Sequence, residues 1–132
     1  MTLHVATVTL VVDGYDRGIA FFRDVLGLAL TADTPLPGGK RWVTVAGPGG
    51  ARLLLAQADG ETQQAAIGNQ TGGRVGFFLE TDDFEWDHAR LVKAGVRFLE
   101  APRHESYGSV AVFEDPFGNK WDLIGPKRPE EN

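Results

Sequence analysis

Few residues of this sequence are of types that carry out chemistry. The 132 residues include three histidines and no cysteine. A thiolate nucleophile, a disulfide bond and a cysteine-rich metal site are therefore excluded. The histidines are His4, His88 and His104, and no two of them lie four apart on a helix or two apart on a strand, the spacings that bring side chains together. The histidines alone do not predict a metal centre.

The segment 103–108, a predicted loop, contains several other residues of types that take part in ligand binding or catalysis. It contains an arginine, a glutamate and a tyrosine beside His104. Loops with this mixture often contact ligands. His104 is suited to act as an acid or base near neutral pH, with Tyr107 as a hydrogen-bond donor. A solvated polar loop is the alternative interpretation.

The elements that position these residues form an internal repeat of about 68 residues. Residues 8–13 align with residues 75–80 at an offset of 67, and both stretches read as strands. A turn with proline and glycine follows later in each copy, at residues 46–50 and 114–118, where the offset is 68. We attribute the change in offset to one extra residue near Thr81.

A helical stretch follows the first strand of each copy. Apolar residues recur at helical spacing from Ile19 to Leu26 and, more weakly, from Phe84 to Val92, and a glycine ends each stretch, Gly27 and Gly95. The order β-α-β-β-β thus occurs twice, which predicts an α+β fold. We expect a single domain over residues 1–132, with module one at about 5–58, a linker at 59–72 and module two at about 73–125.

Alternation along the strands separates two faces of each predicted sheet. One face is apolar and packs under a helix: Val8, Leu10, Val12, Val43, Val45, Leu53, Leu55, Val75, Phe77, Leu79, Trp121 and Leu123. The second face mixes apolar and polar side chains: Thr7, Thr9, Trp42, Thr44, Leu54, Arg74, Phe78 and Asp122. This mixture is typical of a ligand pocket. A dimer interface, also aromatic and apolar at its centre, is an equally open interpretation.

Composition and charge exclude several classes of function. The net charge is −5, and lysine and arginine are scattered along the chain, whereas a nucleic-acid surface needs a basic stripe. No apolar run approaches the length of a membrane span, and no signal-peptide pattern opens the chain. We therefore expect a cytoplasmic protein, and its acidity suits a cationic or neutral small ligand.

Two segments carry a resemblance to a known family. Residues 21–27, Phe-Phe-Arg-Asp-Val-Leu-Gly, resemble the FY-x-x-x-LG segment of the vicinal oxygen chelate superfamily. Residues 113–123, from Phe113 to Leu123, resemble its F-x-DP-x-GN-x-x-EL hairpin. That superfamily contains glyoxalase I, extradiol dioxygenases, fosfomycin-resistance enzymes and bleomycin-resistance proteins. The resemblance implies paired βαβββ modules with two curved mixed sheets around a cleft, within a homodimer.

The resemblance also implies where a metal would be bound. The four ligand positions of its metal-dependent members fall here on Thr7, Leu54, Arg74 and Asp122. Of these, Asp122 alone is a competent ligand, since leucine has no donor atom and arginine would repel a cation. We therefore expect no metal cofactor. We expect instead that Arg74 and Asp122 form an ion pair, or that an unpaired Arg74 attracts a carboxylate or phosphate.

Three functions follow from this combination. The first is metal-free binding of a small molecule, by which a drug or metabolite is sequestered; Trp42 and Phe78, and also Trp86, would supply stacking surface. The second is a metal-dependent lyase or dioxygenase of the same superfamily with substituted ligands. The third is a partner-binding subunit. The missing metal ligands favour the first, and the sequence does not decide whether the protein is an enzyme.

Overall fold

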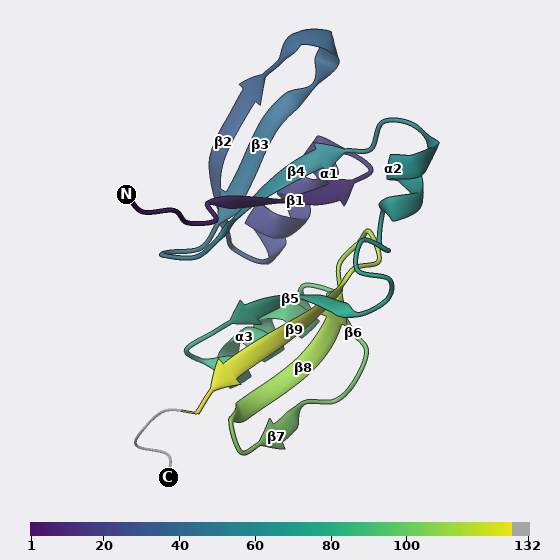
Figure 1. Cartoon of the computed structure of the whole chain (residues 1–132). Helices are drawn as coiled ribbons and strands as arrows, with labels where there is room; N and C mark the ends of the chain where they lie inside the picture. The colour runs from purple at the N-terminus through teal and green to yellow at the C-terminus, as the bar shows by residue number, and fades with distance from the viewer. Residues whose placement is uncertain (128–132) are drawn as a thin grey trace. The chain divides into compact units, whose positions relative to one another are not determined.

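The computed structural model describes residues 1–127 in two compact units, Met1–Gln70 and a second unit that begins at Thr71 (Figure 1). Residues 128–132, which belong to the predicted 1–132 domain, lie outside the described residues. Each unit has its own sheet and core and is described by itself. That the two units make one domain stays a prediction.

The first unit is a four-stranded mixed sheet with helices on one face. Its elements are β1 (Thr7–Val12), α1 (Tyr15–Ile19), a π-helix (Ala20–Val25), β2 (Ala29–Pro35), a 3-10 turn (Pro37–Gly39), β3 (Arg41–Ala46), β4 (Arg52–Gln57) and α2 (Glu61–Ala66). The strand order is β1-β4-β3-β2, with β1 parallel to β4 and the other pairs antiparallel. Six side chains with no exposed surface form its core: Leu10, Val12, Phe22, Val43, Val45 and Leu55.

The second unit repeats this topology. It contains β5 (Val75–Glu80), α3 (Phe84–Lys93), β6 (Arg97–Phe98), β7 (Arg103–Glu105), β8 (Gly108–Glu114) and β9 (Lys120–Pro126). The order is β5-β9-β8-β6, with β7 added beside β8 and β5 parallel to β9. The β-α-β-β-β order predicted for each module is thereby confirmed. Gly27 (φ 85°) and Gly95 (φ 88°) follow the helices in the left-handed conformation predicted for them.

Aromatic rings fill the space between α3 and its sheet. Trp121 stacks on Phe77, with ring centroids 4.7 Å apart, and on Phe113 at 5.9 Å. His88 lies within the same layer, 4.4 Å from the Phe98 ring and 5.7 Å from that of Phe84. His88 is therefore a packing residue on the side of α3 that faces the sheet.

Asp115 organises the proline- and glycine-containing turn between β8 and β9. Its side chain is 3% exposed. The carboxylate accepts hydrogen bonds from the backbone N–H groups of Phe117 and Asn119, both at 3.0 Å. It also accepts from the indole N–H of Trp121 at 2.9 Å and from the Asn119 amide. This turn therefore depends on a buried carboxylate whose acceptor positions are filled by the protein itself.

Three details of the predicted strands are corrected by the structure. A β-bulge lies between Val75 and Phe77, so the register of β5 changes at Gly76 rather than near Thr81. Val8 was predicted to pack but is 41% exposed, unlike Leu10 and Val12 of the same strand, which are fully buried. Half of the predicted loop at residues 103–108 is β7, which pairs with β8.

The outer edge of β1 is closed by a side chain. The Gln70 side-chain carbonyl accepts a hydrogen bond from the Val11 backbone N–H at 2.9 Å, and its amide donates to the Thr9 carbonyl at 2.6 Å. A neighbouring strand would bind the same two groups. Within residues 1–127, no helix is long and apolar enough to cross a lipid bilayer.

Candidate functional site

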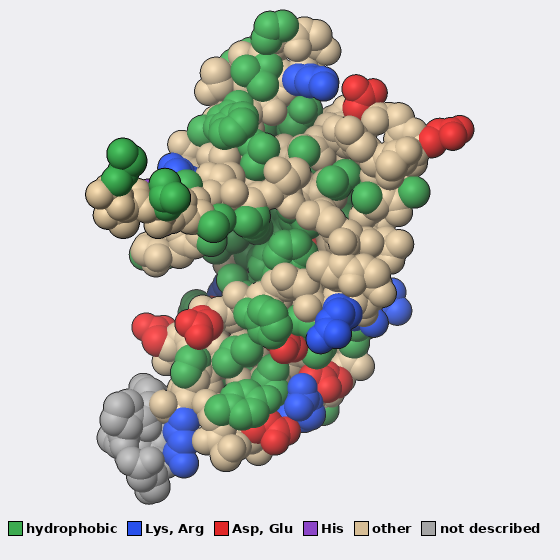
Figure 2. Space-filling model, in the orientation of Figure 1, with side chains coloured by type: hydrophobic (Ala, Val, Ile, Leu, Met, Phe, Trp, Pro, Cys, Tyr) green, Lys and Arg blue, Asp and Glu red, His purple; other side chains and the backbone are tan. Residues whose placement is uncertain are grey.

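An exposed aromatic ring lies beside a carboxyl group on the helix-free face of the second sheet. In the strand pairing, Phe78 of β5 is opposite Asp122 of β9, which is opposite Val112 of β8. Phe78 is 62% exposed, although α3 covers the other face of this sheet. Hydrophobic side chains reach the surface of each unit on the face seen in Figure 2. The row Phe78–Asp122–Val112 is the centre of the candidate site in this unit.

Asp122 has an unsatisfied carboxyl oxygen. Its Oδ1 atom is buried and has no hydrogen-bond partner among the described residues. Burial disfavours the charged form and raises the pKa of Asp122 above its usual value, an effect that Arg103 opposes and Glu100 reinforces. A buried acceptor without a partner costs free energy, so this oxygen makes the native state less stable than a satisfied oxygen would.

Glu100 and Arg103 form a bidentate ion pair next to Asp122. The Arg103 Nε donates to Glu100 Oε1 at 3.0 Å, and its second terminal nitrogen donates to Glu100 Oε2 at 3.2 Å. Glu100 Oε2 also accepts from the Val112 backbone N–H at 3.0 Å. The guanidinium is the main cause that lowers the pKa of Glu100. Its third nitrogen donates to Glu105 at 3.3 Å, so Arg103 is committed to two carboxylates.

The sequence analysis did not identify Glu100 as a site residue. It precedes β7 by three positions and belongs to no helix or strand, so neither alternation nor helical spacing assigned it to a face. Glu100 and Arg103 are separated by Ala101 and Pro102 in irregular chain. A spacing of three outside a helix does not predict an ion pair. The bond from Glu100 to the Val112 backbone, twelve residues away, appears only in the folded structure.

The predicted ion pair between Arg74 and Asp122 is wrong. Arg74 lies one residue before β5 and is exposed, and Val75, not Arg74, pairs with Lys120. The two residues lie far apart along the strands, because Phe78 is opposite Asp122 and Arg74 precedes Phe78 by four residues. The charged groups that act on Asp122 are Arg103 and Glu100. The Arg74 carbonyl, for its part, accepts a hydrogen bond from the Thr71 hydroxyl at 2.7 Å.

His104 and Tyr107 lie apart from Asp122. His104 pairs with Ser109 across β7 and β8, and its Nδ1 is 2.8 Å from the Ser109 hydroxyl. Because alternate residues face opposite sides of a sheet, His104 and Ser109 share the helix-covered face, whereas Asp122 is on the other. Tyr107 lies in the turn between β7 and β8 and is 55% exposed. The structure does not bring either residue to Asp122, and their predicted roles stay predictions.

The first sheet has a comparable helix-free face. Thr9 is opposite Leu54, which is opposite Thr44, and Thr7 is opposite Arg52. Trp42 lies in β3 opposite Thr34 and is 45% exposed.

Thr44 differs from the other members of this row because it is 3% exposed. Its hydroxyl is 2.7 Å from that of Thr31, which sits at a β-bulge in β2. The hydrogen bond between the two threonines satisfies both hydroxyl groups. Thr44 is therefore less accessible to a ligand than Thr9 or Trp42.

The residues present do not fit the metal that the superfamily implies. Leu54 offers no donor atom, Thr7 offers a hydroxyl, which binds Zn²⁺ or Fe²⁺ poorly, and Arg74 is a cation. Within residues 1–127, no group of three histidine, aspartate or glutamate side chains is arranged to hold a metal ion.

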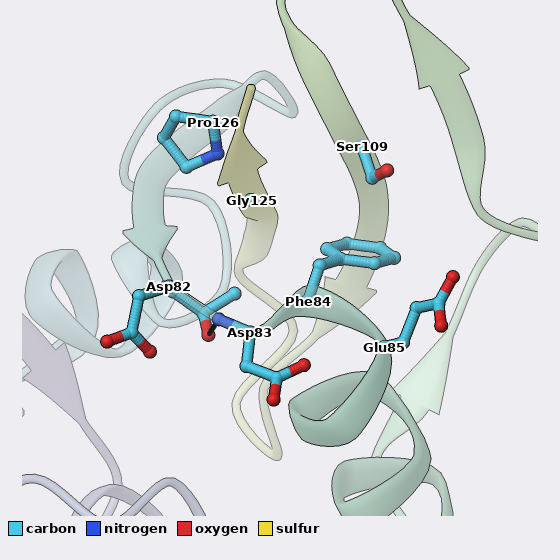
Figure 3. A pocket seen from close by; sticks show the side chains of 8 residues that line it. Asp82, Asp83, Phe84, Glu85, Ser109, Gly125 and Pro126 are labelled. Carbon is cyan, nitrogen blue, oxygen red and sulfur yellow. Dashed lines mark hydrogen bonds between the residues drawn. The ribbon is translucent and has the colours of Figure 1, made fainter. Parts of the chain in front are cut away.

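A hollow of about 250 Å³ lies at the first turn of α3, on the helix side of the second sheet (Figure 3). It is lined by Thr81, Asp82, Asp83, Phe84, Glu85, Ser109, Gly125 and Pro126. The carboxylates of Asp82, Asp83 and Glu85 point in different directions, and the Phe84 ring lies toward Ser109. Asp83 accepts a hydrogen bond from the Trp86 backbone N–H, as helix-capping residues do. Helix capping accounts for the carboxylate of Asp83. No predicted site residue lines the hollow.

Comparison with known proteins places the chain in one family. The family described as the Glyoxalase/Bleomycin resistance protein/Dioxygenase superfamily matches residues 3–123. A protein of Shewanella frigidimarina (strain NCIMB 400), described as uncharacterized, is 46% identical over 94% of both chains.

Solved structures agree with this assignment. TnmS3, described as an antibiotic binding protein from Streptomyces sp. CB03234, is 31% identical, with a TM-score of 0.76 over 96% of this chain and 98% of that one. UcmS2 is 28% identical, with a TM-score of 0.79 over 94% and 98% of the two chains. A glyoxalase/bleomycin resistance protein, also from Streptomyces sp. CB03234, is 31% identical, with a TM-score of 0.70 over 92% and 99%.

Proposed function

Because the chain belongs to the glyoxalase/bleomycin resistance protein/dioxygenase superfamily, we propose that it binds a small organic molecule, a drug or a metabolite, without a metal ion. The observation that carries this proposal is the exposed Phe78 ring beside the unpaired oxygen of Asp122. A large exposed ring next to an unsatisfied acceptor has no structural purpose in the unit itself. A ligand that covers the Phe78 ring removes its apolar surface from water, which favours binding.

The chemistry of this face suits binding better than catalysis. Ligand sites are largely apolar with a few placed polar groups, and Phe78, Val112 and Asp122 provide this combination. The Glu100–Arg103 pair is already satisfied internally, so it shapes the surface rather than offering a reactive group. Both histidines of this unit, His88 and His104, lie on the helix side of the sheet.

The structural relatives support the same function. TnmS3 is described as an antibiotic binding protein, and its chain matches nearly all of this one. Sequestration of a drug requires only affinity, and it does not need the metal ligands that leucine and arginine cannot supply at the superfamily's metal positions. We therefore propose drug or metabolite sequestration rather than metal-dependent lyase or dioxygenase chemistry.

Thermal-shift measurements with a panel of antibiotics test the proposal. We expect at least one compound to raise Tm, because a ligand that binds the native state stabilises it, and we expect EDTA to leave that shift unchanged. Phe78→Ala should weaken the shift, whereas Trp86→Ala, which removes an equally exposed ring from α3, should not. Stoichiometric metal in protein purified without chelator, together with a ligand shift lost in EDTA, would contradict it.

We also propose that the protein acts as a homodimer in the cytoplasm. The solution mass from light scattering tests the first part, with a monomeric mass of 14.3 kDa as the contrary result. Cell fractionation of the native host tests the second.

A further inference from the structure

Two aspartates of this chain are followed by a glycine, in Asp13-Gly14 and Asp59-Gly60. The backbone nitrogen after an aspartate can attack the side-chain carboxyl group, because the ring that closes has five members, and glycine has no Cβ to hinder the approach. The attack requires the backbone at the aspartate to rotate until Cγ reaches that nitrogen. The surroundings of each aspartate therefore decide which of the two reacts in the folded protein.

Asp13 lies between packed elements of the first unit. It follows Val12, the last residue of β1, which has no exposed surface, and it precedes α1, in which three of the five residues are buried. The Asp13 carboxylate forms an ion pair with the Arg17 guanidinium, and the Gly14 carbonyl accepts a hydrogen bond from the Gly18 N–H at 3.1 Å. Rotation at Asp13 would therefore require α1 to leave the sheet.

Asp59 lies in an open segment of the same unit. Its side chain is 72% exposed, and the ion pair that it forms with Lys40, at 3.8 Å, adds little stability because both groups are in water. The helix that follows, α2, has no buried residue and lies apart from the sheet (Figure 1). The Asp59 N–H is tied to this helix by a hydrogen bond to the Gln63 side-chain oxygen at 2.9 Å. Rotation at Asp59 disturbs only exposed contacts, and segments of this kind open at a low free energy.

The nitrogen that would attack Asp59 belongs to Gly60. Among residues 1–127, no group accepts a hydrogen bond from the Gly60 N–H. The φ angle of Gly60 is 89°, a conformation that favours glycine. A residue whose Cβ would hinder the attack is therefore disfavoured at this position.

We propose that Asp59 is a site of spontaneous isomerisation to isoaspartate and that the fold protects Asp13 from the same reaction. The Gly60 nitrogen forms a bond to Cγ of Asp59, and the carboxyl OH leaves with the amide proton as water. A second water molecule then opens the succinimide ring. Its addition to Cγ restores aspartate, whereas its addition to the backbone carbonyl carbon breaks the bond from that carbon to the Gly60 nitrogen. The chain then runs through Cβ and Cγ of the former Asp59, and nothing is oxidised or reduced.

The product has one additional backbone atom before α2 and a free α-carboxylate at position 59. Because α2 contributes no buried residue, the core of the unit stays in place. We therefore expect the isomerised protein to keep its midpoint of unfolding in urea.

Peptide mapping of aged protein tests this inference. Trypsin separates the two aspartates, since Asp13 lies in the peptide 1–17 and Asp59 in the peptide 53–74. The folded full-length protein is kept at neutral pH and physiological temperature in H₂¹⁸O, so that each ring opening adds a heavy oxygen, and electron-transfer fragmentation locates the isoaspartate. We expect it to form at least about tenfold faster at Asp59 than at Asp13, which corresponds to about 1.4 kcal/mol in the free energy of local opening. In urea, without the fold, the two aspartates should react at similar rates.

Three variants assign the reaction to these residues. Asp59→Glu, which would have to close a less favourable six-membered ring, should remove isoaspartate from the peptide 53–74, whereas the matched change Asp13→Glu should leave it unchanged. Gln63→Ala removes the hydrogen bond that ties Asp59 to α2 and should increase the rate at Asp59. Equal rates at the two aspartates in the folded protein, or isoaspartate at position 59 only in urea, would overturn the inference.

Discussion

Replacing Asp115 by alanine tests whether the buried carboxylate holds the β8–β9 turn. The substitution removes the acceptor of four buried donors: the backbone N–H groups of Phe117 and Asn119, the side-chain amide of Asn119 and the indole N–H of Trp121. An unpaired buried donor costs about 1–3 kcal/mol. Water that enters the vacated volume recovers part of this, so we use the lower end for each donor and expect a loss of about 4 kcal/mol.

That loss is large against a total stability of about 5–15 kcal/mol for a folded protein. Urea unfolding monitored by tryptophan fluorescence measures it directly, with an unchanged m-value as the condition for comparing the two proteins. Asp82→Ala is the matched control, since it removes an exposed carboxylate and should change the free energy of unfolding by less than about 0.5 kcal/mol.

Trp121→Phe identifies the role of the indole donor. In a double-mutant cycle with Asp115→Ala, the second substitution should cost less in the absence of the carboxylate, with a coupling of about 1 kcal/mol for the lost hydrogen bond. An Asp115→Ala protein within about 1 kcal/mol of the wild type, or a coupling near zero, would refute the reasoning that this carboxylate organises the turn.

Three further predictions concern single residues. Asp122→Asn should raise Tm at pH 7, because the burial that raises the pKa of this carboxyl group makes its charged form unfavourable in the native state. Below pH 4 the wild-type carboxyl group is protonated, so the difference in Tm measured by calorimetry should vanish. Glu100→Gln should act in the opposite direction and lower stability at pH 7 by at most about 1 kcal/mol, a difference lost below pH 4.5 as the lowered pKa of Glu100 is passed. Gly108→Ala should prevent folding or lower the free energy of unfolding by more than about 3 kcal/mol, since its Cβ would lie 2.2 Å from a backbone carbonyl oxygen of β9. Gly27→Ala, whose Cβ would have no atom within 4 Å, should lower it by about 1 kcal/mol. Unfolding followed by circular dichroism measures both changes.

The architecture of each unit could be predicted because its signals are local. Alternating apolar residues, a glycine at φ 85° or 88° after each helix and a turn with proline and glycine each occur within a few residues of sequence. Their recurrence in one order identified the modules. The aspartate of the second turn shows why such a motif is specific: Asp115 fills its acceptor positions only with residues that follow it closely.

The candidate site was predicted only in part, because register and long-range contacts decide it. Phe78 and Asp122 were assigned to the second face and lie next to each other there. Arg74 was misplaced because the pairing register of two strands depends on long-range contacts: Phe78, four residues after Arg74, is opposite Asp122. Glu100 was missed because its position depends on a bond to the backbone of another strand.

The glutamine at the end of the first unit has a consequence for self-association. Edge strands present unpaired backbone groups on which another chain can add a strand, and proteins protect such edges in various ways. Here the side chain of Gln70 binds two of the outward-facing groups of β1, the Val11 N–H and the Thr9 carbonyl. A substitution of Gln70 would leave both groups available to an incoming strand while every core residue stays in place, so one solvent-exposed side chain protects this part of the edge.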